Sequence, residues 1–164
     1  MRIGLSTDIH RLEAGYKLII GGVYVPNELG SVGHSDGDCL LHTVCESLIG
    51  ALALGDLGKL FPDTSEEFKG IDSSLLVLQV MKKVKEKNYK VINIDSTVFL
   101  EEPKLSGYIP EMRRNIARLL EIEIDQVSVK ATTSEKVWIV GRKEAIMTES
   151  IVLCVAWTTC CGCG

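Results

Sequence analysis

Segments with strand periodicity alternate with segments of helical periodicity along this 164-residue chain, and this order most constrains its fold. Strands are expected around Ile3 and Leu5, over 17–26 as a hairpin, and over 90–100, 126–132 and 149–157. Helices are expected to begin at Ser35, at Ser73 or Ser74, and at Pro110. A single domain is therefore predicted: an α/β (α+β) sandwich in which helices cover a mixed sheet.

The first expected helix has the clearest start. Ser35 and Asp38 are spaced as in a capping box, with Asp in place of the usual Glu. One apolar face follows at helical spacing and consists of Leu41, Cys45, Leu48 and Leu52. That face places Cys45 in the core as a small hydrophobic residue. Residues 27–35 and 55–62, on either side of this helix, are expected to be loops.

The charge balance and the apolar runs exclude some classes of protein. Lys and Arg number 18 and Asp and Glu number 22, a net charge of −4, so no nucleic-acid polymer is expected as a partner. The longest apolar run, Leu48 to Leu54, is shorter than the roughly 20 residues that cross a bilayer, so no membrane partner is expected. The N-terminal segment lacks a secretory pattern, which favours the cytoplasm, or the plastid stroma for a mature chain.

Three of the six cysteines, Cys160, Cys161 and Cys163, stand among the last five residues. Residues 158–164 form a break in composition, so the folded domain is expected to cover 1–157. The tail is expected to be unstructured or an artificial extension, although adjacent cysteines could also bind a soft metal. Because thiols stay reduced in the expected compartment, no disulfide framework is predicted.

Three residues have the composition of a catalytic zinc site with an open fourth position: Asp8, His10 and His42. Alternation along a strand points Asp8 and His10 to the same face. His42 stands on the expected helix with Asp38 and Glu46 one turn away, as possible partners that orient its ring. The alternative is a chance Asp-x-His with an ordinary helical histidine, since no spacing rule brings the strand to His42.

Two further segments are suited to phosphate groups. Residues 34–38 stand at a helix N-terminus, where free N–H groups attract anions. Residues 130–136 combine hydroxyls, two lysines and Glu135, whose carboxylate could hold Mg²⁺ between phosphates. Polar turns would explain the same residues. The loop 56–63, with two carboxylates, is either a ligand contact or a plain connection.

Taken together, these ordered motifs resemble the family of 2-C-methyl-D-erythritol 2,4-cyclodiphosphate synthases, over residues 1 to about 157. The motifs are Asp8-Ile9-His10-Arg11, Gly33-His34-Ser35-Asp36-Gly37-Asp38, His42, Gly55-Asp56-Leu57-Gly58-Lys59-Leu60-Phe61-Pro62-Asp63 and Val129-Lys130-Ala131-Thr132-Thr133-Ser134-Glu135-Lys136. The resemblance implies a homotrimer with sites between neighbouring subunits. It also implies conversion of 4-diphosphocytidyl-2-C-methyl-D-erythritol 2-phosphate to the cyclic diphosphate with release of CMP.

The resemblance assigns a role to each matching residue. It implies Zn²⁺ at Asp8, His10 and His42, and Mg²⁺ or Mn²⁺ at Glu135, with His34 and Thr133 stabilising the transition state. It implies an erythritol-phosphate pocket that includes Ser35, Asp56, Leu57, Gly58, Phe61, Asp63 and Ser65. It implies a cytidine-diphosphate pocket of the adjacent subunit that includes Leu100, Lys104, Leu105, Ser106, Ala131 and Thr132.

The resemblance also implies an apolar cavity on the trimer axis, where Arg142 and Glu149 would hold an isoprenoid diphosphate. The chain departs from the family pattern at four positions, which are Ser6, Glu46, Trp138 and Ile139. Trp138 replaces a residue that is usually small, so binding at the axis is an open expectation. Two other functions are considered: a metal-dependent phosphohydrolase at the same site, and a non-catalytic regulator that binds isoprenoid diphosphates.

Overall fold

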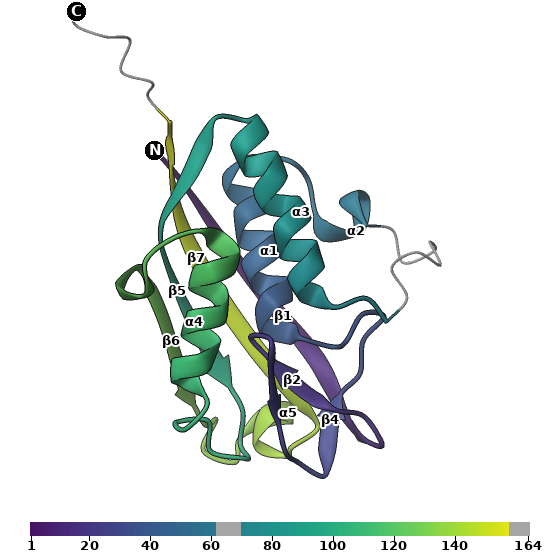
Figure 1. Cartoon of the computed structure of the whole chain (residues 1–164). Coiled ribbons are helices and arrows are strands. Elements are labelled where there is room, and N and C mark those ends of the chain that lie inside the picture. The colour runs from purple at the N-terminus through teal and green to yellow at the C-terminus, as the bar shows by residue number, and fades with distance from the viewer. Residues whose placement is uncertain (62–69, 158–164) are drawn as a thin grey trace, which may run out of the picture.

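A curved sheet of five strands forms the back of the molecule in the computed structural model, which describes residues 1–61 and 70–157 (Figure 1). The strand order is β4-β1-β7-β5-β6, with bounds β1 Arg2–Ala14, β4 Leu29–Ser31, β5 Tyr89–Phe99, β6 Val127–Thr132 and β7 Ala145–Ala156. β5 and β6 run parallel, and the other neighbouring strands run antiparallel. The expected mixed sheet is thus confirmed.

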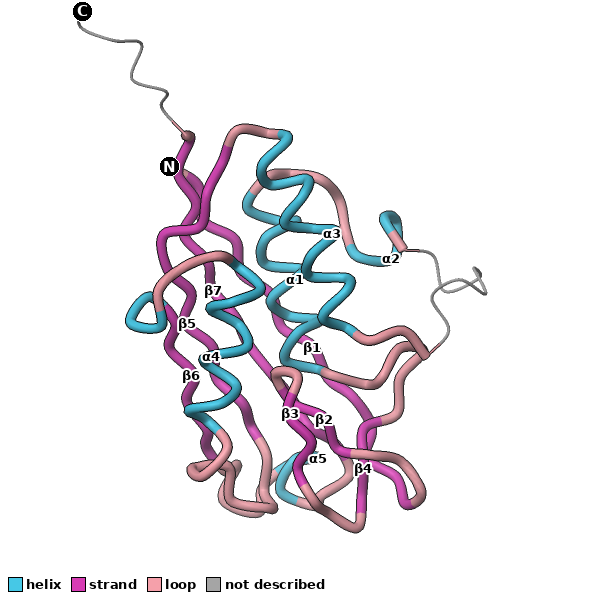
Figure 2. Tube along the Cα trace, viewed as in Figure 1, coloured by secondary structure: helices cyan, strands magenta, loops and turns pink. Residues whose placement is uncertain are grey.

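Three helices cover one face of this sheet, as Figure 2 shows. They are α1 Cys39–Ala51, α3 Ser73–Glu86 and α4 Ile109–Leu120. α1 packs on β1 and β7, α4 packs on β6, and α3 lies between the two helices. The predicted apolar face of α1 is confirmed, because Leu41, Cys45 and Leu48 are fully buried. The fold is therefore a two-layer α+β sandwich.

Asp38 begins α1 and also holds a hairpin. The hairpin consists of β2 Leu18–Ile20 and β3 Val23–Val25, joined by Gly21 and Gly22 with positive φ, as the sequence predicts. Asp38 accepts hydrogen bonds from the backbone N–H groups of Leu41, Gly21 and Gly22. The predicted capping box is wrong, since Asp38 is itself the N-cap rather than its partner three residues later, and Ser35 lies outside the helix.

A close approach at Gly4 sets the distance between β1 and α1. A Cβ atom added at Gly4 would lie 1.8 Å from the carbonyl oxygen of Ser47 and 2.6 Å from the nitrogen of Ala51. Both contacts are to backbone atoms of α1, which cannot rotate away. Only glycine therefore allows the strand to pass so near the helix.

Two strands are longer in the structure than the sequence predicts, and several short elements were not predicted. β7 already begins at Ala145 because ten residues of it pair with β1, and β1 continues to Ala14 because its last three residues pair with β4. The structure adds β4, a short helix α2 over Leu57–Leu60, a 3₁₀ turn η2 over Ile124–Gln126 and a short helix α5 over Trp138–Gly141. Such short elements depend on tertiary contacts and leave little periodicity to read.

The other face of the sheet is not covered by any described helix and carries apolar side chains. Ile3, Leu5, Ile9 and Ile151 are 66%, 68%, 42% and 43% exposed. Their positions in the β1–β7 register place them on the side away from α1. Within the described residues, no helix is long and apolar enough to span a membrane.

Candidate active site

The three predicted metal ligands meet in one cluster, although they come from two elements. Asp8 and His10 project from alternate positions of β1, and His42 projects from the first turns of α1. Nε2 of His10 lies 2.9 Å from Oδ2 of Asp8, and Nδ1 of His42 lies 3.2 Å from Nε2 of His10. One ligand atom from each residue lies within 4.8 Å of the other two. The cluster fits a single metal ion held by two nitrogens and one oxygen.

Neighbouring groups orient both imidazoles. Nδ1 of His10 lies 3.0 Å from the carbonyl oxygen of Gly37 and 3.2 Å from Oγ of Ser31. A carbonyl can only accept, so His10 donates Nδ1–H to Gly37 and keeps the lone pair of Nε2 directed at the cluster. On the other ring, Nε2 of His42 lies 2.8 Å from Oγ of Ser35 and leaves Nδ1 for the cluster. Gly37 and Ser31 were not predicted as hydrogen-bond partners of His10.

Asp38 and Glu46, the predicted partners of His42, make other contacts. The carboxylate of Asp38 is fully buried among the N–H groups of α1 and the hairpin turn. Oε1 of Glu46 accepts a hydrogen bond of 2.9 Å from the backbone nitrogen of Leu57, at the start of α2. The prediction that they orient His42 is therefore not supported by the described contacts, because unpaired N–H groups at helix starts and turns attract these carboxylates.

The cluster is electrostatically coupled. Burial raises the pKa of the Asp8 carboxyl, but hydrogen bonds and charge from His10 and His42 outweigh burial and hold the pKa far below the ordinary 3.8. Burial lowers the pKa of His10, but the hydrogen bond and charge of Asp8 reverse this, so its pKa lies above 6.5. A divalent cation bound here would displace protons from the cluster, because its ligands would be a deprotonated carboxylate and two neutral imidazoles.

A cavity of about 380 Å³ opens beside the cluster. Its lining includes the cluster itself and residues from the loop before α1 and from α2, among them His34, Ser35, Leu57, Gly58 and Phe61. Asp56 does not line it but caps α2, accepting a hydrogen bond of 2.7 Å from the nitrogen of Lys59. Ser6 and Thr7 also line this cavity and were not predicted as pocket residues. Asp63 and Ser65, predicted for the same pocket, lie outside the described residues.

A second cavity, of about 230 Å³, contains the whole predicted cytidine set. Leu100, Lys104, Leu105 and Ser106 come from the segment after β5, and Ala131, Thr132 and Thr133 come from the end of β6. Parallel pairing of β5 and β6 brings their carboxyl ends together, which explains why segments 30 residues apart share one cavity. Glu101 and Pro103, which fall within the predicted range 100–106, and Ile109, which was not predicted, complete the lining.

Glu135 stands beside this second cavity in a strained backbone. Oγ1 of Thr133 donates a hydrogen bond of 2.9 Å to Oε1 of Glu135. Glu135, Lys136 and Trp138 have φ values of 52°, 62° and 62°, in the left-handed region that disfavours side chains. Strain of this kind concentrates at functional sites.

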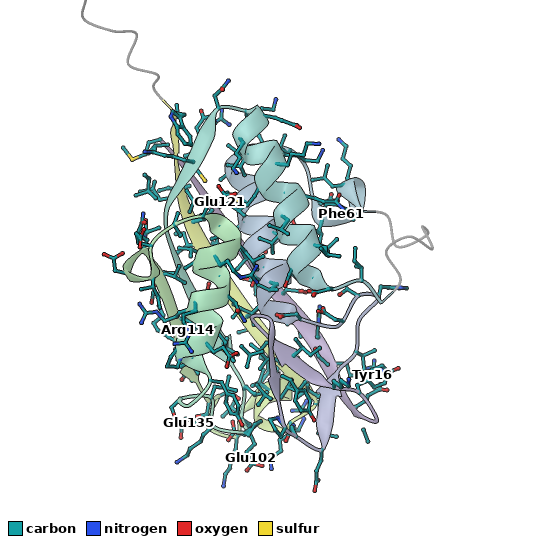
Figure 3. All side chains as sticks on the ribbon, viewed as in Figure 1. Tyr16, Phe61, Glu102, Arg114, Glu121 and Glu135 are labelled. Carbon is teal, nitrogen blue, oxygen red and sulfur yellow. The ribbon has the colours of Figure 1, made fainter. Side chains whose placement is uncertain are left out.

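The two cavities lie on different sides of the chain. Phe61, which lines the first cavity, and Glu135, next to the second, appear at opposite sides of the molecule in Figure 3. The cavities share no lining residue. Arg142 and Glu149, predicted for the axial site, lie apart from both linings, and Nε of Arg142 is ion-paired at 2.7 Å with Glu144.

An α+β sandwich with an Asp-His-His cluster beside an open cavity defines a candidate metalloenzyme. The sequence model of the YgbB family matches residues 1–155, and the chain belongs to this family. The 2-C-methyl-D-erythritol 2,4-cyclodiphosphate synthase of Chloroherpeton thalassium is 52% identical over 153 residues, which cover 93% of this chain and 98% of that relative.

Two solved structures have the same fold. IspF of Plasmodium falciparum, in a CDP complex, has a TM-score of 0.84 and 32% identity, and the match covers 96% of this chain and 97% of that one. The bifunctional IspDF of Campylobacter jejuni has a TM-score of 0.90 and 37% identity. The match covers 95% of this chain but 43% of IspDF, so this chain spans less than half of that protein.

The relatives define the activity of the chain. It is that of a cyclodiphosphate synthase, an enzyme of the lyase class in isoprenoid precursor synthesis. Neither a phosphohydrolase nor a non-catalytic regulator is favoured by these matches.

Proposed function

We propose that this activity is carried out in a composite site, in which the metal-side cavity of one subunit meets the second cavity of a neighbour. The observation that carries the proposal is the cluster of Asp8, His10 and His42 at the wall of a cavity of about 380 Å³. The substrate is 4-diphosphocytidyl-2-C-methyl-D-erythritol 2-phosphate, and the products are the cyclic diphosphate and CMP.

Zn²⁺ is the proposed occupant of the cluster, because two imidazole nitrogens and one carboxylate leave a fourth position open for substrate. Mg²⁺ or Mn²⁺ is proposed at Glu135, whose carboxylate oxygen is a ligand that these hard cations prefer. When bound, two cations neutralise the crowded phosphate oxygens and bring the reacting groups into line.

The erythritol-phosphate end of the substrate is assigned to the metal-side cavity. His34 and Ser35 come from the loop that leads into α1, and Leu57 and Gly58 of α2 line the same space. Asp56 supports these contacts by capping α2. Phe61 lines the same cavity. Asp63 and Ser65, which lie outside the described residues, are proposed as further substrate contacts.

The cytidine-diphosphate end is assigned to the second cavity. Apolar residues there, such as Leu100 and Leu105, offer a surface to a base, and Lys104 and Ser106 offer charge and a hydroxyl to phosphate. The Plasmodium falciparum relative, at 32% identity, is solved as a CDP complex, which supports a cytidine diphosphate ligand for this chain.

The chemical step is an intramolecular phosphoryl transfer. An oxygen of the 2-phosphate forms a bond to the β-phosphorus, the bond from that phosphorus to the CMP oxygen breaks, and CMP leaves with the bond electrons. The nucleophile is already anionic, so the chain needs to hold the two ends together rather than remove a proton. Thr133 and His34 are proposed to donate hydrogen bonds to phosphate oxygens as charge builds up.

A homotrimer is the proposed assembly. The sheet face opposite α1 carries exposed apolar residues, including Leu5 and Ile151, and burying it in a subunit interface would remove this surface from water. The opposite positions of Phe61 and Glu135 fit a site that is completed by a neighbour.

The axial ligand is proposed as an isoprenoid diphosphate held near Arg142 and Glu149. Glu149 lies on β7 in register with Thr7 of β1 and Thr97 of β5, in the centre of the sheet. Arg142 is exposed and would have to exchange its ion pair with Glu144 for a diphosphate. Binding of such a ligand to the assembled protein, measured by calorimetry and lost in Arg142→Ala, tests this assignment.

The central experiment incubates the purified protein with the diphosphocytidyl substrate, Zn²⁺ and Mg²⁺, and measures CMP release together with the phosphorus NMR spectrum of the product. A cyclic diphosphate is the expected product, whereas a linear product would mean hydrolysis. His42→Ala should lose turnover, and metal removal should abolish activity that zinc restores. Full activity without metal would overturn the two-metal scheme.

A further inference from the structure

Five buried side chains with hydroxyl or thiol groups form a continuous ladder between α1 and the sheet. They are Cys39 and Thr43 of α1, Ser96 of β5, and Thr148 and Ser150 of β7, each at most 1% exposed. The surrounding core is apolar, so this polar ladder is an exception that no predicted role explains.

The ladder crosses from one layer to the other through short contacts. Oγ1 of Thr148 donates to the carbonyl oxygen of Cys39 at 2.9 Å and lies 3.0 Å from Oγ1 of Thr43. Oγ of Ser150 donates to Oγ1 of Thr43 at 3.2 Å, and Oγ of Ser96 lies 2.8 Å from Oγ of Ser150. Two strands are thereby tied to the first two turns of one helix.

The ladder ends beside the metal cluster on both layers. Thr148 is the residue on β7 that pairs with Asp8 of β1. Thr43 follows His42 directly in α1, and Cys39 is three residues before it. The contacts of Thr148 therefore join the strand position of Asp8 to the helical turn that carries His42.

Hydrogen bonds and apolar packing have different consequences here. Apolar contacts are non-directional and tolerate small shifts of a helix along a sheet, whereas hydrogen bonds require defined distances and angles. Replacing a buried polar network by apolar groups of similar shape is often neutral for stability. The distinct contribution of such a ladder is therefore the register of α1 on the sheet, beyond the close approach at Gly4.

We propose that Thr148 is a positioning residue that, with Thr43 and Ser150, sets α1 on β7 so that His42 reaches Asp8 and His10. This inference rests on the proposed metal site. It assigns to the buried hydroxyls an effect on metal affinity and coordination geometry that is separate from their effect on stability.

Thr148→Val is a direct test, because the only ladder donor that loses its acceptor is the weak thiol donor of Cys39, whose Sγ lies 3.3 Å from Oγ1 of Thr148. Thr43 still donates to the carbonyl oxygen of Leu40 at 2.9 Å, and Ser150 still donates to Thr43. The probe is Co²⁺ added to metal-free protein, with affinity and the visible absorption spectrum as readouts. Thr148→Val should weaken Co²⁺ binding by about tenfold, the lower end of what supporting groups of metal ligands contribute. Its spectrum should change as well.

Two matched variants separate an effect on the position of α1 from an effect on the stability of the protein. Thr148→Ser keeps the hydroxyl and should restore the affinity and the spectrum. Ile116→Val removes a methylene from the core at α4, which packs on α3 and β6, and should lower the melting temperature without changing Co²⁺ binding. The double variant Ser96→Ala/Ser150→Ala removes the two ladder hydroxyls that lie farther from the metal cluster, and it should also weaken Co²⁺ binding. It keeps the inference testable if Thr148→Val does not fold.

The outcomes are distinguishable. Wild-type affinity and spectrum in both Thr148→Val and the double variant would overturn the inference while leaving the metal site intact. Equal weakening in Thr148→Ser and Thr148→Val would also overturn it. Failure of the wild-type protein to bind Co²⁺ or Zn²⁺ would instead overturn the proposed metal site.

Discussion

Oγ of Ser35 lies 2.8 Å from Nε2 of His42, on the ring atom that does not face Asp8. Such a contact holds the imidazole so that Nδ1 is available to a metal. Ser35 also lines the metal-side cavity, so one hydroxyl both contacts a proposed metal ligand and borders the proposed substrate pocket.

Ser35→Ala should therefore weaken Zn²⁺ binding by about tenfold to a hundredfold, the usual effect of removing a group that orients a ligand. Competition with a chromophoric chelator measures this affinity. Ser128→Ala is the control, because Ser128 lies on β6, three strands away from β1. Unchanged zinc affinity in Ser35→Ala would show that the hydroxyl does not orient His42.

Asp38→Ala should lower the free energy of unfolding by about 3 kcal/mol or more, because three backbone N–H groups lose a charged acceptor. Urea unfolding of the metal-free protein measures the change. Asp72→Ala is a matched control, since Asp72 also caps a helix but accepts only from Ser74 among the contacts described, and about 1 kcal/mol is expected. Equal losses in the two variants would contradict the role of Asp38 in holding the hairpin.

The stability of the metal-free protein should depend on pH through Asp8 and His10. The lowered pKa of Asp8 adds stability above its ordinary pKa of 3.8, which is lost as the pH falls through the native value. The raised pKa of His10 adds stability below its ordinary pKa of 6.5, which is lost as the pH rises through the native value. Their mutual contribution is therefore greatest between pH 3.8 and 6.5.

Melting temperatures of wild type and Asp8→Asn across this range check the pH dependence. The difference between the two proteins should be largest between the two ordinary pKa values and should narrow at higher pH. A difference that grows above pH 7 would contradict the sign of the His10 shift. Both proteins must be metal-free, because a bound cation replaces the proton on His10.

Leu5→Glu should dissociate the proposed trimer. Leu5 is 68% exposed in the single chain and stands in the apolar face of the sheet, so a buried carboxylate there would lack a partner. Analytical ultracentrifugation should give three times the mass of one chain for wild type and a single chain for the variant. Tyr24→Glu, at a 56% exposed position of the hairpin, should remain trimeric. A monomeric wild type would rule out the assembly.

Part of the candidate site could be predicted from chemical identity and local spacing, and the rest only through the family resemblance. Asp8 and His10 share a face in any strand, whereas the residues proposed to contact cytidine diphosphate were assigned through the family resemblance, and the structure gathers them, with Lys104 and Thr133 among them, around one cavity. The meeting of β1 with His42 could not be derived from spacing, because it depends on tertiary packing at Gly4 and Thr148.

Partners of buried carboxylates were the least predictable part. Helical spacing placed Asp38 and Glu46 near His42, but Asp38 accepts N–H groups from the hairpin turn and from its own helix, and Glu46 accepts the N–H of Leu57. Those donors belong to the turn at Gly21 and to α2 at Leu57, and only the folded chain brings them close. Position on a helix therefore predicts which face a carboxylate lies on, and not which donor it meets.

The separation of the two cavities on one chain has a genetic consequence. In an assembly that joins them, each working site takes its metal ligands from one copy and its cytidine contacts from the next. A copy that lacks His42 still offers an intact Thr133, and a copy with a damaged Thr133 still offers His42. Two inactive alleles of this kind, expressed together, would complement each other and rebuild a fraction of complete sites, whereas two alleles damaged in the same cavity would not.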